Sequence, residues 1–224
     1  MIEVLLRSLL LAAASAGLLL LVGPLLAYLN RRAYPGRTLV ESLLLTPLAL
    51  PPTVLGFYLL LLLSPEGPIA RVIGLSLAFT FPGMVLGAAV FSLPFAYTAY
   101  REAFRALDED LLETARTLGA GRLRRAREVV LPLVWPGIVS GTLLAFAHAL
   151  GEFGVVLMVG GNIPGKTQVA STYIYDLVEG LEFTAAHRAS AIMLALAFAL
   201  VYLTRALEER WRSATGSTGR SRSR

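Results

Sequence analysis

Residues 108–132 read DEDLLETARTLGAGRLRRAREVVLP and form a charged segment between long apolar stretches. Asp110 can cap a short helix there, and Glu113, three residues later, can reach back to the cap. Gly119 can adopt the left-handed backbone conformation that commonly ends a helix. The pattern therefore predicts a helix of about two turns over residues 111–118.

One face of this helix is apolar and is formed by Leu111, Ala115 and Leu118. So short a helix is marginal in water, and we expect it to pack on another surface. A basic run follows it and comprises Arg122, Arg124, Arg125 and Arg127. These features alone leave open whether the segment rests on lipid headgroups or docks on another molecule.

The composition is that of an integral membrane protein. Of the 224 residues, 56% are hydrophobic and 16% are charged, which is too apolar for a soluble domain with a solvated surface. The net charge of +5 comes from loops and the carboxyl-terminal segment, without a basic stripe interleaved with aromatic residues, so we expect no nucleic-acid partner. The chain has no Cys, which excludes a disulfide framework and a thiolate metal site.

Five apolar stretches alternate with polar segments. A helix needs about 20 residues to cross the hydrocarbon core of a bilayer, and the stretches near or above this length are residues 9–28, 39–63, 73–97, 133–158 and 189–203. We therefore predict an all-α fold, a polytopic bundle of five transmembrane helices in one domain over residues 1–204. Prolines at Pro47, Pro51 and Pro52 predict that the second helix is bent and faces protein.

The arginines predict the orientation of the chain. They concentrate in residues 30–38, 100–132 and 205–224, and positive residues favour the cytoplasmic side of a membrane. Five spans then place the amino terminus outside and the carboxyl terminus inside, with residues 101–132 as a cytoplasmic loop. Residues 205–224 are expected to form a basic, disordered cytoplasmic tail.

Residues 160–167 read GGNIPGKT and match the spacing of a phosphate-binding loop. Such a loop must follow a buried strand and open a helix whose amino end binds phosphate. This segment instead follows an apolar span, contains Pro164 and lies outside in the predicted topology. We therefore reject nucleotide binding here.

Four polar residues in the apolar stretches are candidates for a pathway or gate: Thr53, Ser92, His148 and Glu152. An ionised Glu152 would repel an anion, so it is either a hydrogen-bonding residue at a helix end or subunit interface, or part of a gate. His148 is interpreted as an interior histidine with a satisfied hydrogen bond, because nothing pairs with it at metal-ligand spacing. The hydroxyls of Thr53 and Ser92 can line a polar path or bond to neighbouring helices.

Catalysis has no support in the sequence. We find no Ser/His/Asp spacing, no metal cluster and no paired carboxylates within a span, so a membrane-embedded enzyme has little support and we expect no metal or cofactor in this chain.

The order Glu113-Thr114-Ala115, then Gly119, then Leu131-Pro132 resembles the cytoplasmic EAA loop of ABC-transporter permease subunits, with Thr114 where alanine is commonest. In that family the loop forms a coupling helix seated in a groove of the ATP-hydrolysing subunit. The resemblance implies that the ATPase-coupling residues are Asp110, Leu111, Glu113, Thr114, Ala115, Leu118, Gly119, Leu131 and Pro132.

Three further segments resemble permeases for molybdate and related tetrahedral oxyanions. They are ALGEFG at 149–154, continued by VVLMVGGNIPGKTQ, LPPTVLG at 50–56 and YPGR at 34–37. The resemblance extends over about residues 13–203 and implies that molybdate is the substrate. Sulfate, thiosulfate and tungstate permeases are close relatives and stay open, and a channel or carrier that works without ATP is the alternative outside this class.

The resemblance also implies an assembly in a bacterial or archaeal cytoplasmic (inner) membrane. Its parts are a second copy of this chain, two ATPase subunits that bind ATP and Mg on the cytoplasmic face, and an external substrate-binding protein. Asn162 and Lys166 lie in the predicted outer segment and are expected to contact that external protein.

Overall fold

The computed structural model describes the backbone of residues 1–216 and their side chains, except those of residues 73, 207, 208 and 210–216. Within this part of the chain the fold is all-α without a strand, which confirms the predicted class. The α-helices are α1 (Ile2–Leu29), α2 (Arg37–Leu45), α3 (Pro52–Leu63), α4 (Pro68–Ile73), α5 (Phe81–Arg105), α6 (Glu109–Thr117), α7 (Arg122–Arg125), α8 (Leu131–Leu150), α9 (Gly154–Gly160), α10 (Ala170–Glu179) and α11 (Phe183–Gly216).

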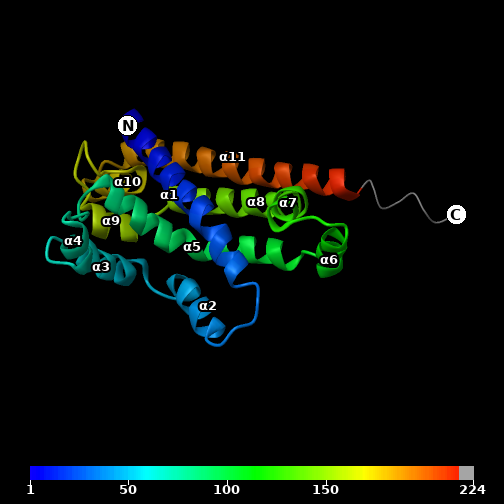
Figure 1. Ribbon diagram of the computed structural model, residues 1–224. Coiled ribbons are helices and arrows are strands. Elements are labelled where there is room, and N and C mark those ends of the chain that lie inside the picture. Colours follow the sequence, from blue (N-terminus) through cyan, green and yellow to red (C-terminus); the bar gives the residue numbers. More distant parts are fainter. Residues whose placement is uncertain (217–224) are drawn as a thin grey trace.

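Five helical segments are long and apolar enough to cross a membrane, as predicted: Ile2–Leu29, Pro52–Val72, Phe81–Arg105, Arg122–Leu150 and Phe183–Ala206. Figure 1 shows α1, α5, α8 and α11 as long rods along the bundle, with α2 set off from them. The amino terminus, α4, α9 and α10 lie at one end of the bundle, and α6 and α7 lie toward the other.

Prolines break the second predicted span into separate helices. Helix α2 ends at Leu45, a 3-10 turn follows at Thr46–Leu48, and Pro51 has an extended backbone (φ −56°, ψ 135°) before Pro52 opens α3. Proline lacks an N–H and disfavours the helical conformation of the residue before it, so the Pro-Pro pair cannot continue a helix. The prediction of one bent helix over residues 39–63 is therefore wrong.

Local capping also shifts the third span, which begins at Phe81 rather than at residue 73. The side chain of Thr80 caps α5 by accepting a hydrogen bond from the backbone N–H of Gly83 at 3.2 Å, and Pro82 occupies the first turn.

The last two spans also differ in their ends. Helix α8 stops at Leu150 rather than at residue 158, and α9 begins after a short turn. Helix α11 continues to Gly216, so the expected disorder from residue 205 is wrong for residues 205–216. The remainder of the predicted tail, residues 217–224, lies outside the described residues.

Helix α5 forms the centre of the bundle and packs against both α1 and α8. The buried ring of Tyr100 lies between Gly23 of α1 and Gly141 of α8. A Cβ at Gly23 would lie 2.4 Å from the ring, and one at Gly141 would lie 2.7 Å from it. The hydroxyl of Tyr100 bonds to Oγ1 of Thr142 at 2.7 Å. Glycine at these two positions therefore lets the helices approach the ring closely, as small residues do in membrane bundles.

A Gly141→Ala substitution should lower the free energy of unfolding by about 1–3 kcal/mol, because the added methyl group overpacks the contact with Tyr100. Gly17→Ala on α1 is the matched control, since nothing lies within 4 Å of a Cβ added there. Unfolding in detergent solution measures both variants. Equal stability of the two would contradict this account of the α5–α8 contact.

Candidate functional site

Helix α6 follows the central helix α5 and begins at a side-chain cap. Oδ1 of Asp108 accepts a hydrogen bond from the backbone N–H of Asp110 at 2.9 Å. The prediction that Asp110 is the cap is therefore wrong, and the helix begins two residues earlier than residue 111, at Glu109. Asp108 has the extended backbone of a cap residue. The negative charges of Glu109 and Asp110 interact favourably with the positive amino end of the helix dipole.

The carboxyl end of α6 is terminated at Gly119, the glycine that was predicted to end it. Gly119 has φ +82°, in the left-handed region, which confirms the prediction. Its N–H bonds to the carbonyl of Arg116 at 3.0 Å, and the N–H of Ala120 bonds to the carbonyl of Ala115 at 3.0 Å. This pair of bonds is a Schellman motif, and it satisfies carbonyls that the helix end leaves free.

The apolar face of α6 is largely exposed within the described chain. None of its residues is buried, and Leu111 and Leu118 are 44% and 82% exposed. Glu113 and Thr114 are exposed as well, and Ala115 is half-buried. So short a helix with two exposed leucines agrees with the expectation that it packs on another surface.

One ion pair ties α6 to the bundle. The guanidinium of Arg31, just after α1, contacts the carboxylate of Glu109 in the first turn of α6. The helix is therefore attached at its amino end, while Leu111 and Leu118 on its apolar face stay exposed.

The segment from α6 to α8 contains a π-helical turn at Ala126–Val130. Pro132 in the first turn of α8 has no N–H for the carbonyl of Glu128, and the wider turn coincides with that missing bond. Leu131 lines a groove beside α6, and Pro132 is exposed. The structure thus brings Leu131 near α6, although the two belong to different helices.

Two of the predicted pathway residues lie together in the bundle. Oγ of Ser92 on α5 is 3.1 Å from Nδ1 of His148 on α8. The imidazole also contacts the rings of Phe91 and Phe95, with centroids 5.0 and 4.1 Å away. His148 is therefore a hydrogen-bonded interior residue, in agreement with its interpretation.

Glu152 lies in the turn between α8 and α9 rather than inside a continuous span, which corrects its predicted position. It is 5% exposed, and its Oε1 accepts a hydrogen bond from the N–H of Val155 at 2.8 Å. Its carbonyl accepts a hydrogen bond from the hydroxyl of Ser171 at 2.7 Å. Glu152 therefore caps α9 and holds the turn to α10. Thr53 is exposed at the start of α3, which contacts the start of α9 at Gly154.

The loop after α9 contains the two residues that were predicted to contact an external protein. Asn162 donates hydrogen bonds to both carboxylate oxygens of Asp176, at 2.8 and 2.9 Å, and is half-buried. Lys166 is exposed. The buried hydroxyl of Thr167 donates to the carbonyl of Gly160 at 2.6 Å, and the next helix begins only at Ala170. This geometry differs from a phosphate-binding loop and supports the rejection of nucleotide binding.

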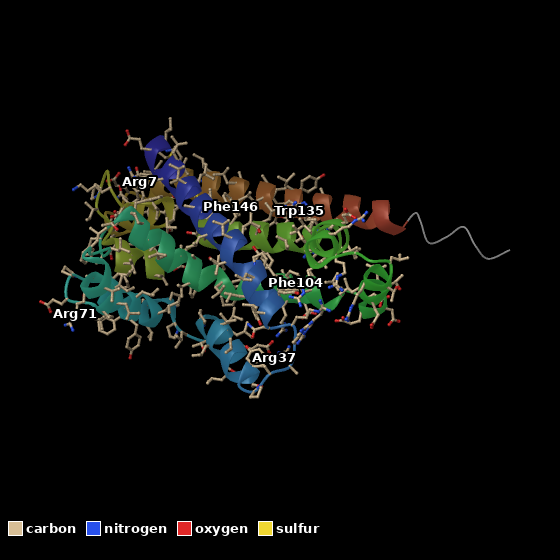
Figure 2. All side chains as sticks on the ribbon, viewed as in Figure 1. Arg7, Arg37, Arg71, Phe104, Trp135 and Phe146 are labelled. Carbon is tan, nitrogen blue, oxygen red and sulfur yellow. The ribbon has the colours of Figure 1, made fainter. Side chains whose placement is uncertain are left out.

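Arg7 is a functional candidate that the sequence pattern did not single out. From α1 it donates hydrogen bonds to the carbonyls of Gln168 at 2.8 Å and Gly165 at 3.1 Å, and so fixes the loop between α9 and α10. Figure 2 shows Arg7 beside this loop at the amino-terminal end of the bundle. Its partners lie more than 150 residues away in sequence, so no local spacing could reveal them.

Glu41 on α2 is another functional candidate that the sequence pattern did not single out. Its Oε1 accepts hydrogen bonds from Arg37 at 3.1 Å and from the hydroxyl of Tyr97 on α5 at 3.4 Å, and lies 3.5 Å from Arg101. Burial raises the pKa of this carboxyl, but the hydrogen bond and charge of Arg37 and the charges of Arg101 and Arg105 together hold the pKa below its usual value. The ionised carboxylate thus ties α2 to the carboxyl half of α5.

The chain was compared with known protein families. Residues 9–213 match the family described as "Binding-protein-dependent transport system inner membrane component". The chain belongs to this family. It is therefore a multi-pass membrane component of a transporter and not an enzyme, as predicted.

Relatives of this permease include two with named substrates. It is 43% identical over 197 residues to the molybdenum transport system permease protein ModB of Azotobacter vinelandii, covering 86% of this chain and 87% of the relative. It is 35% identical over 193 residues to the sulfate transport system permease protein CysT of Salmonella typhimurium, covering 84% and 70%.

The fold of the permease is similar to a chain in the crystal structure of a bacterial alginate ABC transporter in complex with alginate pentasaccharide-bound periplasmic protein. The TM-score is 0.70 at 23% identity, over 93% of this chain and 78% of the other. At this identity the similarity concerns the fold alone.

An Arg7→Gln variant should loosen the loop between α9 and α10, because two carbonyls lose charge-assisted hydrogen bonds. Amide hydrogen exchange of residues 163–170 should become faster by about tenfold, which corresponds to about 1.4 kcal/mol for the lost bonds. Arg71→Gln, an exposed arginine at the same end of the bundle (Figure 2), is the control. Unchanged exchange in the Arg7 variant would show that other contacts hold the loop.

Proposed function

We propose that this chain is the membrane-spanning subunit of an ABC importer for a tetrahedral oxyanion, with molybdate as the substrate. The observation that carries the proposal is the 43% identity with a molybdenum permease across most of both chains. The sulfate permease relative is less similar, at 35%, and makes sulfate the second candidate.

The proposed assembly contains two copies of this chain, two ATPase subunits and an external substrate-binding protein. The ATPases bind ATP and Mg, and this chain contributes the path through the membrane. The family description itself refers to transport that depends on a binding protein, which supports an external partner.

Helix α6 is the proposed contact with the ATPase, through the apolar face that Leu111 and Leu118 expose. ATP binding would draw the two ATPases together, and α6 would move with them. This motion can change the state of the permease only if α6 contacts the two ATPase states differently, because equal contacts shift no population.

The proposed orientation places α6 and α7 in the cytoplasm and the loop of Asn162 and Lys166 outside. It is supported by the arginines, which gather around α6, α7 and the carboxyl half of α11, at the end of the bundle opposite the amino terminus. Asn162 is held by Asp176, so the exposed Lys166 is the freer of the two to contact an external binding protein.

The proposed pathway passes near Ser92 and His148, with Glu152 and Thr53 at the turn where α9 and α3 begin. Glu152 is already hydrogen-bonded within the chain, so we assign it the role of holding this turn rather than of binding the anion.

The proposal is tested by uptake into proteoliposomes that contain the complete transporter and its binding protein. ATP-dependent uptake of molybdate, faster than that of sulfate, is expected because the chain is more similar to the molybdenum permease than to the sulfate permease. Equal uptake of sulfate would refute molybdate as the preferred substrate, and uptake without the ATPases would refute the ABC mechanism.

Two glycine variants test the coupling element in the same assay. Gly119→Val should abolish most substrate-stimulated ATP hydrolysis, because valine is strained at φ +82° by about 1–2 kcal/mol or more and the end of α6 would unwind. Gly121→Val is the matched control, since Gly121 has φ −62° and nothing lies within 4 Å of an added Cβ. Normal ATP hydrolysis and uptake with Gly119→Val would contradict the assignment.

A further inference from the structure

A groove of about 1180 Å³ opens between the carboxyl end of α1, the end of α5, α6 and the start of α8. Its floor is apolar and contains Phe104, Val134 and Ile138, which are nearly fully buried. Its sides include the exposed side chains of Leu25 and Leu29. The groove exceeds the roughly 300–1,000 Å³ of usual small-molecule pockets and suits a longer, partly apolar ligand.

Basic side chains dominate the polar part of this groove. The charged residues that line it are Arg31, Arg32, Arg116, Arg122, Arg125, Arg127, Glu109 and Glu113. Arg31 is paired with Glu109. Within the described part of the chain the other five arginines form no ion pair. The groove therefore carries excess positive charge that the chain itself does not neutralise.

The apolar and basic parts follow one another along the segment Arg122–Leu150. From Leu131 to Ile138 the groove follows α8 for about 10 Å, and both residues belong to the membrane-spanning segment Arg122–Leu150. Arg122, Arg125 and Arg127 lie at the amino end of that segment, in and just after α7. In Figure 2, Phe104 marks the floor near the carboxyl end of α1, where its ring packs on Tyr28 with centroids 5.6 Å apart.

We propose that this groove binds an anionic phospholipid of the cytoplasmic leaflet. The phosphate lies among Arg122, Arg125 and their neighbours, and an acyl chain covers Leu25 and Ile138. Basic pockets next to membrane helices recognise phosphate headgroups by charge and by arginine hydrogen bonds. A free oxyanion would leave the apolar floor uncovered, and a soluble subunit would have to enter between spans. The assignment to the cytoplasmic leaflet rests on the proposed orientation. The assignment of the lipid class does not.

Native mass spectrometry of the full-length chain, purified in detergent, tests the proposal. Phosphatidylglycerol should bind at least about tenfold more tightly than phosphatidylcholine. The double variant Arg122→Gln/Arg125→Gln should weaken phosphatidylglycerol binding by about 25-fold, on the scale at which one basic residue near an anionic membrane contributes about fivefold. Arg124→Gln is the matched control, because Arg124 is in the same helix but outside the groove, paired with Glu128 at 2.8 Å.

A second variant tests the apolar part. Leu25→Trp fills the groove without a change of charge at a position that is 58% exposed, so folding should persist. It should weaken binding of phosphatidylglycerol and leave binding of inorganic phosphate unchanged. Equal binding of the two lipids, an equal loss with Arg124→Gln, or displacement of phosphatidylglycerol by millimolar inorganic phosphate would overturn the proposal.

The lipid measurement is independent of transport. A chain that selects phosphatidylglycerol but supports no oxyanion uptake would refute the proposed function alone. A chain that supports uptake but does not distinguish the two lipids would refute this inference alone.

Discussion

The ring of Tyr100 lies between α1 and α8, in space that Gly23 and Gly141 leave open by having no side chain. This contact joins three of the five spans near the end of the bundle where the charged loop emerges. A larger residue at either glycine would push a helix off α5, and hydrocarbon lipid offers no hydrophobic force to drive it back. Close packing around α5 thus holds in place the end of the helix from which the charged loop begins.

Helix α6 has the opposite character. It is held to the bundle by the ion pair between Arg31 and Glu109 and by the chain on either side, and Leu111 and Leu118 on its apolar face remain exposed. Exposed ion pairs contribute little free energy, so a partner can shift α6 at small cost. A tightly packed bundle joined to a well-capped helix with few contacts of its own is suited to transmit motion from a partner subunit to the spans.

The sequence predicted those features that depend on local chemistry or composition. Five apolar stretches gave the number of spans, and Gly119 gave the end of α6, because both signals are contained in short windows. The ends of the helices were less predictable. Pro52 is one of several prolines in its segment that could break a helix, and Asp108 is one of several acidic residues that could cap α6. The link from Arg7 to the loop between α9 and α10 joins positions far apart in the chain, and only the folded structure brings them together.

The central claim, that α6 is where a partner subunit docks, is tested most directly by thiol labelling at Leu118→Cys. The chain has no native Cys, so modification of this chain reports that position alone. In the complete transporter the labelling rate should fall by about tenfold or more relative to the isolated permease, and it should differ between the ATP-bound and nucleotide-free states. A rate that is the same with and without the ATPase subunits, in every nucleotide state, would contradict the account.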